Sequence, residues 1–201
     1  MHFPISQRNH FSKLLLNQCL QTCLQDIINV HYVKLEPITK EKKMNIESSI
    51  FREYDIRGTY PEQINESSIK SIAFAIAKRC KKDNISTLVV GRDGRISGPA
   101  LLEAFCEGLI ESGINVDNIG LVTSPLLYFA AKKSKSKSGI MITGSHNPKN
   151  YNGIKMVIND SPISGTEIYT LISHEKNTNL EKGEIKYSDI KPIYLEEVCK
   201  N

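Results

Sequence analysis

Hydrophobic residues recur with helical spacing in three segments of this chain. They stand at positions i, i+3, i+4 and i+7, which places them on one face of a helix. Asn65 is a suitable N-cap for the first segment, and the other two start at a serine with a proline one or two residues later. The pattern predicts amphipathic helices over 65–82, 97–113 and 124–131.

Short apolar runs alternate with these helices and predict strands over 87–90, 114–122, 139–143 and 153–158. Strands separated by helices of this length are typical of a layered α/β domain with crossover connections. Ligands of such a sheet collect at the carboxyl ends of its strands. We therefore expect the chemistry of the protein in the loops that follow the strands.

The composition excludes several classes of protein. Of the 201 residues, 40% are hydrophobic and 24% are charged, so the chain is neither disordered nor fibrous. No apolar run approaches the about 18 residues that a membrane span needs, and we expect no membrane partner. Of the net charge of +4, +3 belongs to residues 1–43. We interpret 1–43 as an extension of unknown role and expect the working domain to start at Met44.

The extension carries weak signals of its own. Cys19 and Cys23 with His10 or His31 resemble zinc ligands, but no second pair with matching spacing supports them. Helically spaced apolar residues precede the first acid, Asp26, as in a transit peptide, although arginine is nearly absent. Five irregularly spaced cysteines indicate free thiols in a reducing compartment, and we expect a cytoplasmic protein.

Four lysines within 132–137 are the best sign of a nucleic-acid partner, because they could neutralise phosphates. No aromatic residue lies among them, and they follow the third predicted helix. Cations are favoured at a helix C-terminus, so we interpret the run as a solvated helix end and expect no nucleic acid.

The segment 143–155 after the third predicted strand is dense in chemistry. It holds Ser145, His146, Asn147 and Lys155, with a flexible Gly144 before the serine. Neighbouring residues in an extended segment point to opposite sides, so we do not expect His146 to be the base of Ser145. Such a loop can instead display the serine as a phosphate carrier, with amide and ammonium donors around it.

Two further segments carry charged residues that could bind a ligand. The stretch 91–98 carries Arg92 and Arg95 before a helix, where guanidinium groups can face an anion; equally, it is a turn with Ser97 as a cap. The stretch 51–59 is too charged for a buried strand and is expected to be an edge segment with surface ion pairs or a binding segment.

Together, the three segments resemble those of the α-D-phosphohexomutases, most closely the phosphomannomutase/phosphoglucomutase branch. The matches are Phe-Arg-x-Tyr-Asp-Ile-Arg-Gly at 51–58, Gly-Arg-Asp-x-Arg-x-Ser-Gly at 91–98 and Thr-Gly-Ser-His-Asn-Pro-x-x-Tyr-Asn-Gly-x-Lys at 143–155. The resemblance covers about 44–201. It implies domain I of such an enzyme, a layered αβα domain with a mixed, mostly parallel sheet, over 44–190, with the start of domain II at 191–201.

The resemblance also implies roles for individual residues. Ser145 would be the phosphoserine that donates its phosphoryl group to a hexose phosphate, through a hexose bisphosphate intermediate. His146, Asn147 and Lys155 would be its catalytic neighbours, with Lys155 a candidate for proton transfer. A second group would bind substrate: Tyr54, Arg57 and Arg95. Magnesium would be bound in part through the phosphate on Ser145.

The chain also departs from the family that it resembles. Phosphohexomutases have four domains and more than twice this length, and the acidic magnesium loop and sugar-reading loop of the later domains are absent from 156–201. We expect a fragment that is inactive alone, or that works with a separately encoded remainder of the enzyme. The alternatives are a non-catalytic phosphosugar-binding module and a basic nucleic-acid binder that uses 1–43 and 132–137.

Overall fold

The computed structural model describes residues 46–172 and 181–200. Residues Met44–Asn201 form one compact unit. The zinc and transit-peptide interpretations of 1–43 lie outside the described residues. Within the described part of the chain, no helix is long and apolar enough to cross a membrane.

Helices and strands alternate through most of the described chain. In order they are η1 (Ser48–Ile50), β1 (Ile56–Thr59), α2 (Glu66–Lys82), β2 (Thr87–Arg92), α3 (Gly98–Glu111), β3 (Asn115–Leu121), α4 (Ser124–Lys133), β4 (Gly139–Ile142), β5 (Tyr151–Ile158), β6 (Ser161–Pro162), α5 (Gly165–Leu171), β7 (Ile185–Tyr187) and α6 (Lys191–Cys199). The three predicted helices and four predicted strands are therefore confirmed. Five elements lack a sequence prediction: η1, β6, α5, β7 and α6.

The strands form one mixed sheet in the order β1-β5-β4-β2-β3-β7, with β6 paired to β5. β4, β2, β3 and β7 are mutually parallel, whereas β5 is antiparallel to its three neighbours. Every described strand except β5 thus runs in one direction, and the expected mostly parallel sheet is confirmed. The strand β1 lies at an edge, as the charges of 51–59 predict.

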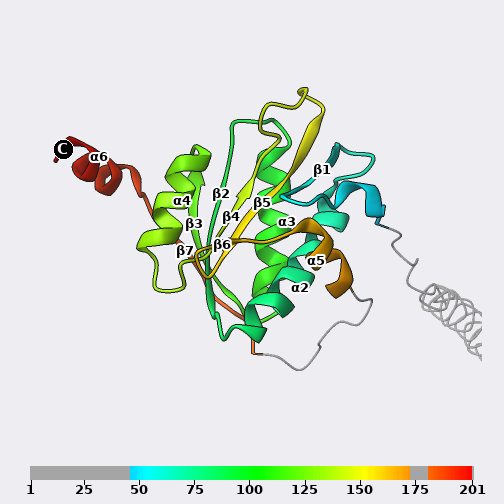
Figure 1. The fold of residues 1–201 in the computed structure, drawn as a ribbon, viewed down its shortest axis with the longest axis horizontal. Helices are drawn as coiled ribbons and strands as arrows, with labels where there is room; N and C mark the ends of the chain where they lie inside the picture. The colour runs from blue at the N-terminus through cyan, green and yellow to red at the C-terminus, as the bar shows by residue number, and fades with distance from the viewer. Residues whose placement is uncertain (1–45, 173–180, 201) are drawn as a thin grey trace, which may run out of the picture. The chain divides into compact units, whose positions relative to one another are not determined.

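Helices cover both faces of the sheet (Figure 1). Side chains of α2, α3 and α5 share one core with residues of β2, β4 and β5, among them the fully buried Leu88, Phe105 and Ile154. On the opposite face, α4 packs Leu127 and Ala130 against Val89 and Met141. The described residues therefore form the three layers of an αβα domain.

Helix ends follow local sequence only in part. Asn65 caps α2 through a capping box: its side chain accepts from the Ser68 backbone N–H, and the Ser68 hydroxyl accepts from the Asn65 N–H. Ser97 makes no such bond at the start of α3; its hydroxyl accepts from the Asn152 amide at 2.8 Å. The expectation that Ser97 is a side-chain cap is wrong, because a partner 55 residues away occupies its oxygen.

The lysine run starts at the end of α4, and its four lysines are exposed. Lys133, the last residue of the helix, pairs with Glu197 at 3.1 Å. Among the described cysteines, Cys80 and Cys106 are buried free thiols, and burial raises the pKa of each to about 12. Such thiols stay protonated and unreactive at neutral pH.

Candidate active site

Loops with polar side chains meet at the carboxyl ends of the parallel strands. Residues 93–97 follow β2, and residues 143–150, the serine loop, follow β4. Because β2 and β4 are adjacent and parallel, their following loops lie side by side. The second part of the predicted loop, from Tyr151, is the strand β5.

Ser145 is exposed at the apex of a tight turn. Its φ is 51°, a left-handed conformation that a non-glycine residue rarely adopts. This turn brings the Ser145 Oγ to 3.3 Å from Nδ1 of His146. The expectation that the two side chains diverge is wrong, because it assumed an extended backbone and the left-handed residue breaks the alternation.

Asp93 braces the serine loop from the neighbouring strand end. Its carboxylate accepts from the Thr143 hydroxyl at 2.7 Å and from the Gly144 N–H at 3.1 Å. The Thr143 hydroxyl in turn accepts from the Ser145 N–H at 2.8 Å. The backbone on both sides of Gly144 is thus tied to one carboxylate, which the sequence offered only as part of an Asp-Gly bend.

The Arg95 guanidinium is directed at main-chain carbonyls of this loop. Its Nη1 donates to the carbonyls of Pro148 at 2.6 Å and Tyr151 at 2.9 Å. Its Nη2 donates to those of Ser145 at 3.1 Å and Asn147 at 2.6 Å. This geometry differs from the expectation that Arg95 faces a substrate anion, because its donors are already engaged.

Asn147 is engaged in the same way. Its side-chain amide donates to the Gly144 carbonyl at 2.9 Å, and its backbone N–H donates to that same carbonyl at 3.0 Å. The side chain closes the turn that carries Ser145. Its expected role as a catalytic neighbour of Ser145 stays a prediction. The contacts that the structure shows for it are those within the serine loop.

A second polar group lies where β1 pairs with β5. The pairs Ile56–Ile154 and Arg57–Gly153 set a register that places Asp55 opposite Lys155. The Asp55 carboxylate accepts from Lys155 Nζ at 3.3 Å and from both Nε and Nη2 of Arg57. The structure therefore brings Arg57 and Lys155, which the sequence predicted as site residues, together on Asp55, which it did not single out.

Asp55 is buried, with 5% of its surface exposed. Burial alone would raise its pKa, but the hydrogen bonds and charges of Arg57 and then Lys155 outweigh that effect and hold the pKa below its usual value. The ion pair of this segment is not the surface pair that its composition indicated. An ionised Asp55 fixes two cations on one side of the sheet.

That side is the one covered by α4. Lys155 is paired with Met141, which packs against α4, and opposed residues of an antiparallel pair share a face. Burial and then the charge of Asp55 raise the pKa of Tyr128, a residue of α4. Tyr128 thus lies within electrostatic reach of the ion cluster. It is a second residue of this face that the sequence did not single out.

Tyr54, next to Asp55 in the sequence, interacts with Glu53 and not with the charged groups of this cluster. It is 71% exposed, and its hydrogen bond and charge interaction with Glu53 raise its pKa. Within the described residues, no hydrogen bond joins the Ser145–His146 pair to the Asp55–Arg57–Lys155 cluster. A substrate would have to bridge the two groups.

The described residues offer no site for a divalent cation by themselves. No cluster of three or more histidine, cysteine or carboxylate side chains occurs in 46–172 or 181–200. Asp93 and Asp55 are both committed to other donors. Magnesium prefers several oxygen ligands, so the donor set of this part of the chain does not fit it.

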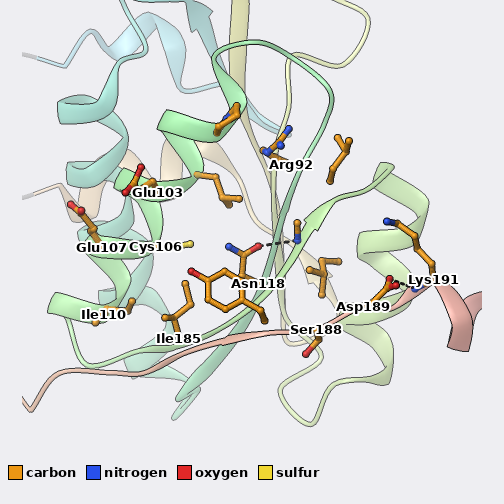
Figure 2. Close-up of a pocket in the computed structure, with 16 residues that line it drawn as sticks. Arg92, Glu103, Cys106, Glu107, Ile110, Asn118, Ile185, Ser188, Asp189 and Lys191 are labelled. Atoms are coloured by element: carbon orange, nitrogen blue, oxygen red, sulfur yellow. Dashed lines mark hydrogen bonds between the residues drawn. The ribbon is translucent and has the colours of Figure 1, made fainter.

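Figure 2 shows a groove that is lined by other residues. Its volume is about 810 Å³, and it lies between α3, β3 and the segment around β7. Arg92 reaches it, and Asn118 and Ile185 also line it. None of the seven predicted site residues lines this groove, so its size does not identify it as the active site.

Comparison with known proteins decides the family. The model for phosphoglucomutase/phosphomannomutase, alpha/beta/alpha domain I, matches residues 48–179. The chain belongs to this family. It is a family of phosphohexomutases, which are isomerases of carbohydrate metabolism.

Two bacterial relatives illustrate the similarity of this chain to the phosphohexomutase family. A phosphoglucomutase from Neisseria meningitidis serogroup B is 39% identical over 158 residues, which are 77% of this chain and 34% of the relative. A phosphomannomutase/phosphoglucomutase from Pseudomonas syringae pv. tomato is 41% identical over 152 residues, 75% of this chain and 33% of the relative. The chain thus spans about a third of the length of these relatives.

A solved structure agrees with the family assignment. A phosphoglucomutase/phosphomannomutase family protein from Burkholderia thailandensis matches with a TM-score of 0.71 and 34% identity. The match covers 78% of this chain and 36% of that one. The family and the fold that the three sequence segments predict are therefore confirmed.

Proposed function

We propose that this chain supplies the phosphoserine of a phosphohexomutase that interconverts hexose 1-phosphate and hexose 6-phosphate, with glucose or mannose as the sugar. The observation that carries the proposal is the exposed hydroxyl of Ser145 on a braced, left-handed turn at the carboxyl edge of the sheet. A phosphoserine needs only in-line positioning of its acceptor and neutralisation of charge.

The transfer conserves atoms and protons. A hydroxyl of the hexose phosphate attacks phosphorus and gives up its proton; the bond from phosphorus to the Ser145 Oγ breaks, Oγ takes up a proton in exchange, and a hexose bisphosphate forms. The bisphosphate then reorients, and its other phosphoryl group returns to Oγ. His146, with Nδ1 at 3.3 Å from Oγ, is placed to exchange the proton that Oγ gains and loses.

The ion cluster on the α4 side of the sheet would hold the substrate. Arg57 offers a fork that matches phosphate oxygens, and Lys155 offers an ammonium group that can donate a proton. Asp55 keeps both cations fixed, so they need little reorganisation when a charged substrate binds. Tyr54 is exposed beside this cluster in sequence and remains a proposed substrate contact.

Magnesium would find only some of its ligands among the described residues. A phosphate on Ser145 would provide oxygen ligands, and the remaining ligands would have to come from outside the described residues. Together with the third of the relatives' length that this chain spans, this supports a second proposal: these residues alone do not complete the mutase cycle, and further catalytic groups come from outside them. The competing function is a phosphosugar-binding module without catalysis.

Labelled hexose bisphosphate tests the phosphoserine. The purified chain is incubated with it, and the label is located by peptide mapping. We expect label on Ser145, none in a Ser145→Ala variant, and unchanged labelling in Gly94→Ala, a substitution into open space on the adjacent loop. Binding of the bisphosphate without any label on Ser145 would favour the non-catalytic module.

A further inference from the structure

The side chains of Asp93 and Arg95 join the loop after β2 to the loop after β4. We propose that Asp93 and Arg95 form a clamp that sets the backbone of the serine loop, so that Arg95 is a positioning residue for Ser145 and not a ligand of the substrate. The catalytic consequence of the clamp rests on the proposed function, whereas its structural part does not.

The hydrogen bonds of Arg95 account for four of its five donors. A guanidinium has five N–H groups. The two of Nη1 and the two of Nη2 donate to four carbonyls within 145–151, and Nε lies 3.5 Å from the Asp93 carboxylate. Nε is held only in this ion pair, and no donor of Nη1 or Nη2 is left for a phosphate. One planar group therefore gathers four carbonyls that would otherwise repel one another and an incoming anion.

Asp93 completes the clamp from the other side. It accepts from the Arg95 backbone N–H at 3.0 Å as well as from Thr143 and Gly144. The carboxylate thus fixes the start of the serine loop, and the guanidinium fixes its middle and end. Between these two anchors, Ser145 is held at a φ of 51°.

The clamp has a chemical consequence on the outer side of the loop. In a trans peptide the N–H points opposite to the C=O. With the Ser145 and Pro148 carbonyls turned toward Arg95, the N–H groups of His146 and Lys149 point away from it. Neither N–H has an acceptor within the described residues. The clamp therefore leaves two main-chain donors of the serine loop, one of them on the residue after Ser145, free to contact a phosphoryl group.

A substitution at Gly144 offers an independent way to disrupt the clamp. A methyl group at this position would lie 2.0 Å from Nε and 2.1 Å from Cζ of Arg95, so Gly144→Ala must displace the guanidinium. Gly144 does not have a positive φ, so alanine meets no backbone strain there. In an Arg95→Ala background the clash is gone. The two substitutions are therefore expected to be non-additive, with the double variant no worse than Arg95→Ala.

Amide hydrogen exchange measured by NMR on the whole chain tests the structural part. We expect exchange of the Ser145 and Asn147 amides to rise by at least about tenfold in Arg95→Ala and in Gly144→Ala, with core amides of β2 unchanged. Free guanidinium ion at non-denaturing concentration is expected to restore protection to Arg95→Ala. Lysine at the position is not, because its single nitrogen cannot span both pairs of carbonyls.

Arg92→Ala is the matched control. It removes the same charge from the same loop, but its guanidinium donates only to the Asp93 carbonyl and touches no carbonyl of the serine loop. Wild-type exchange in Arg95→Ala, or a strictly additive double variant, would overturn the clamp. If Arg95→Ala does not fold, Gly144→Ala alone decides, and unchanged loop exchange in it overturns the proposal.

Labelling of Ser145 by hexose bisphosphate tests the catalytic consequence. At saturating bisphosphate, Arg95→Ala is expected to slow labelling about 10²-fold, the effect of a misplaced reacting group, with an unchanged half-saturation concentration. A rise in the half-saturation concentration with an unchanged maximal rate would make Arg95 a substrate ligand instead. If the wild-type chain takes no label, the proposed function fails, and the exchange experiment still decides the clamp.

Discussion

Ser145 shows how far a single residue departs from local preference. Left-handed backbone costs an L-residue about 1–2 kcal/mol, and such strain persists only where surrounding contacts enforce it. Here Thr143, Asp93 and Arg95 enforce it. The same strain turns the Ser145 hydroxyl toward His146 and out to solvent. Conformation and proposed chemistry are therefore coupled at this residue.

We predict that Ser145→Gly is more stable than Ser145→Ala by about 1 kcal/mol, the reverse of the ordinary order, because glycine relieves the left-handed strain. Urea unfolding measures the difference. Ser71 in α2 is the matched control, where alanine should be the more stable. An alanine preference at both positions would mean that Ser145 is not held in the left-handed region.

Asp55 is the other residue whose environment changes its chemistry. We predict that Asp55→Asn lowers the free energy of unfolding at pH 7 by about 1–3 kcal/mol, because charge-assisted hydrogen bonds to Arg57 and Lys155 are lost. The folded-state pKa lies below the ordinary 3.8, so this stabilisation is full above that value and is lost as the pH falls through the folded pKa.

Urea titrations from pH 7 to acid measure this dependence. The gap between wild type and Asp55→Asn should be constant near neutrality and close in acid. Glu62→Gln, at an exposed carboxylate, should show little gap at any pH. A gap that widened as the pH fell would contradict the pairing.

At the scale of elements, the edge strand β1 depends on close approach to β5. A Cβ at Gly153 would lie 2.0 Å from the Ile56 carbonyl, so only glycine fits opposite Arg57. This contact holds the register that sets Asp55 against Lys155. One glycine of the sheet therefore supports the ion cluster at the proposed site.

We predict that Gly153→Ala destabilises the domain by about 3 kcal/mol, the upper range for overpacking, and raises amide exchange in β1 and β5 first. Thermal unfolding and exchange mapping measure both effects. Gly94→Ala is the control, because a methyl group there meets nothing within 4 Å. Equal stability of the two variants would show that β1 is not docked as described.

At the scale of the whole molecule, the two proposed halves of the site come from different parts of one sheet. The serine loop lies after β4, and the Asp55–Arg57–Lys155 cluster joins β1 to β5. Relatives about three times as long carry the rest of their chains beyond this matched region. For a substrate that bridges the two groups, the remaining contacts to the sugar would have to come from outside the described residues.

We predict that the isolated chain shows no mutase turnover between mannose or glucose 1-phosphate and 6-phosphate, while Ser145 still takes up label. A coupled assay at saturating substrate and magnesium measures turnover. A full-length relative such as the Pseudomonas syringae enzyme is the positive control. Turnover by this chain at the typical 1–10³ s⁻¹ would refute the need for a remainder.

The pattern of hydrophobic residues was enough to predict α2, α3 and α4 and four strands, because these depend on local spacing, whereas a predicted side-chain cap was right only for α2. The dense segment 143–155 and its two companions were enough to predict the family. Short elements such as β7 escaped prediction, because three exposed residues carry no period of their own.

The directions of the key side chains were decided only by the tertiary structure. Arg95 meets carbonyls 50 to 56 residues away, and Asp55 meets Lys155 100 residues away through the register of β1 on β5. Such contacts leave no periodic trace in the sequence. The sequence by itself determined which chemical groups the protein has and which elements carry them. Folding decided which of those groups stay free for a ligand and which hold Ser145 in position.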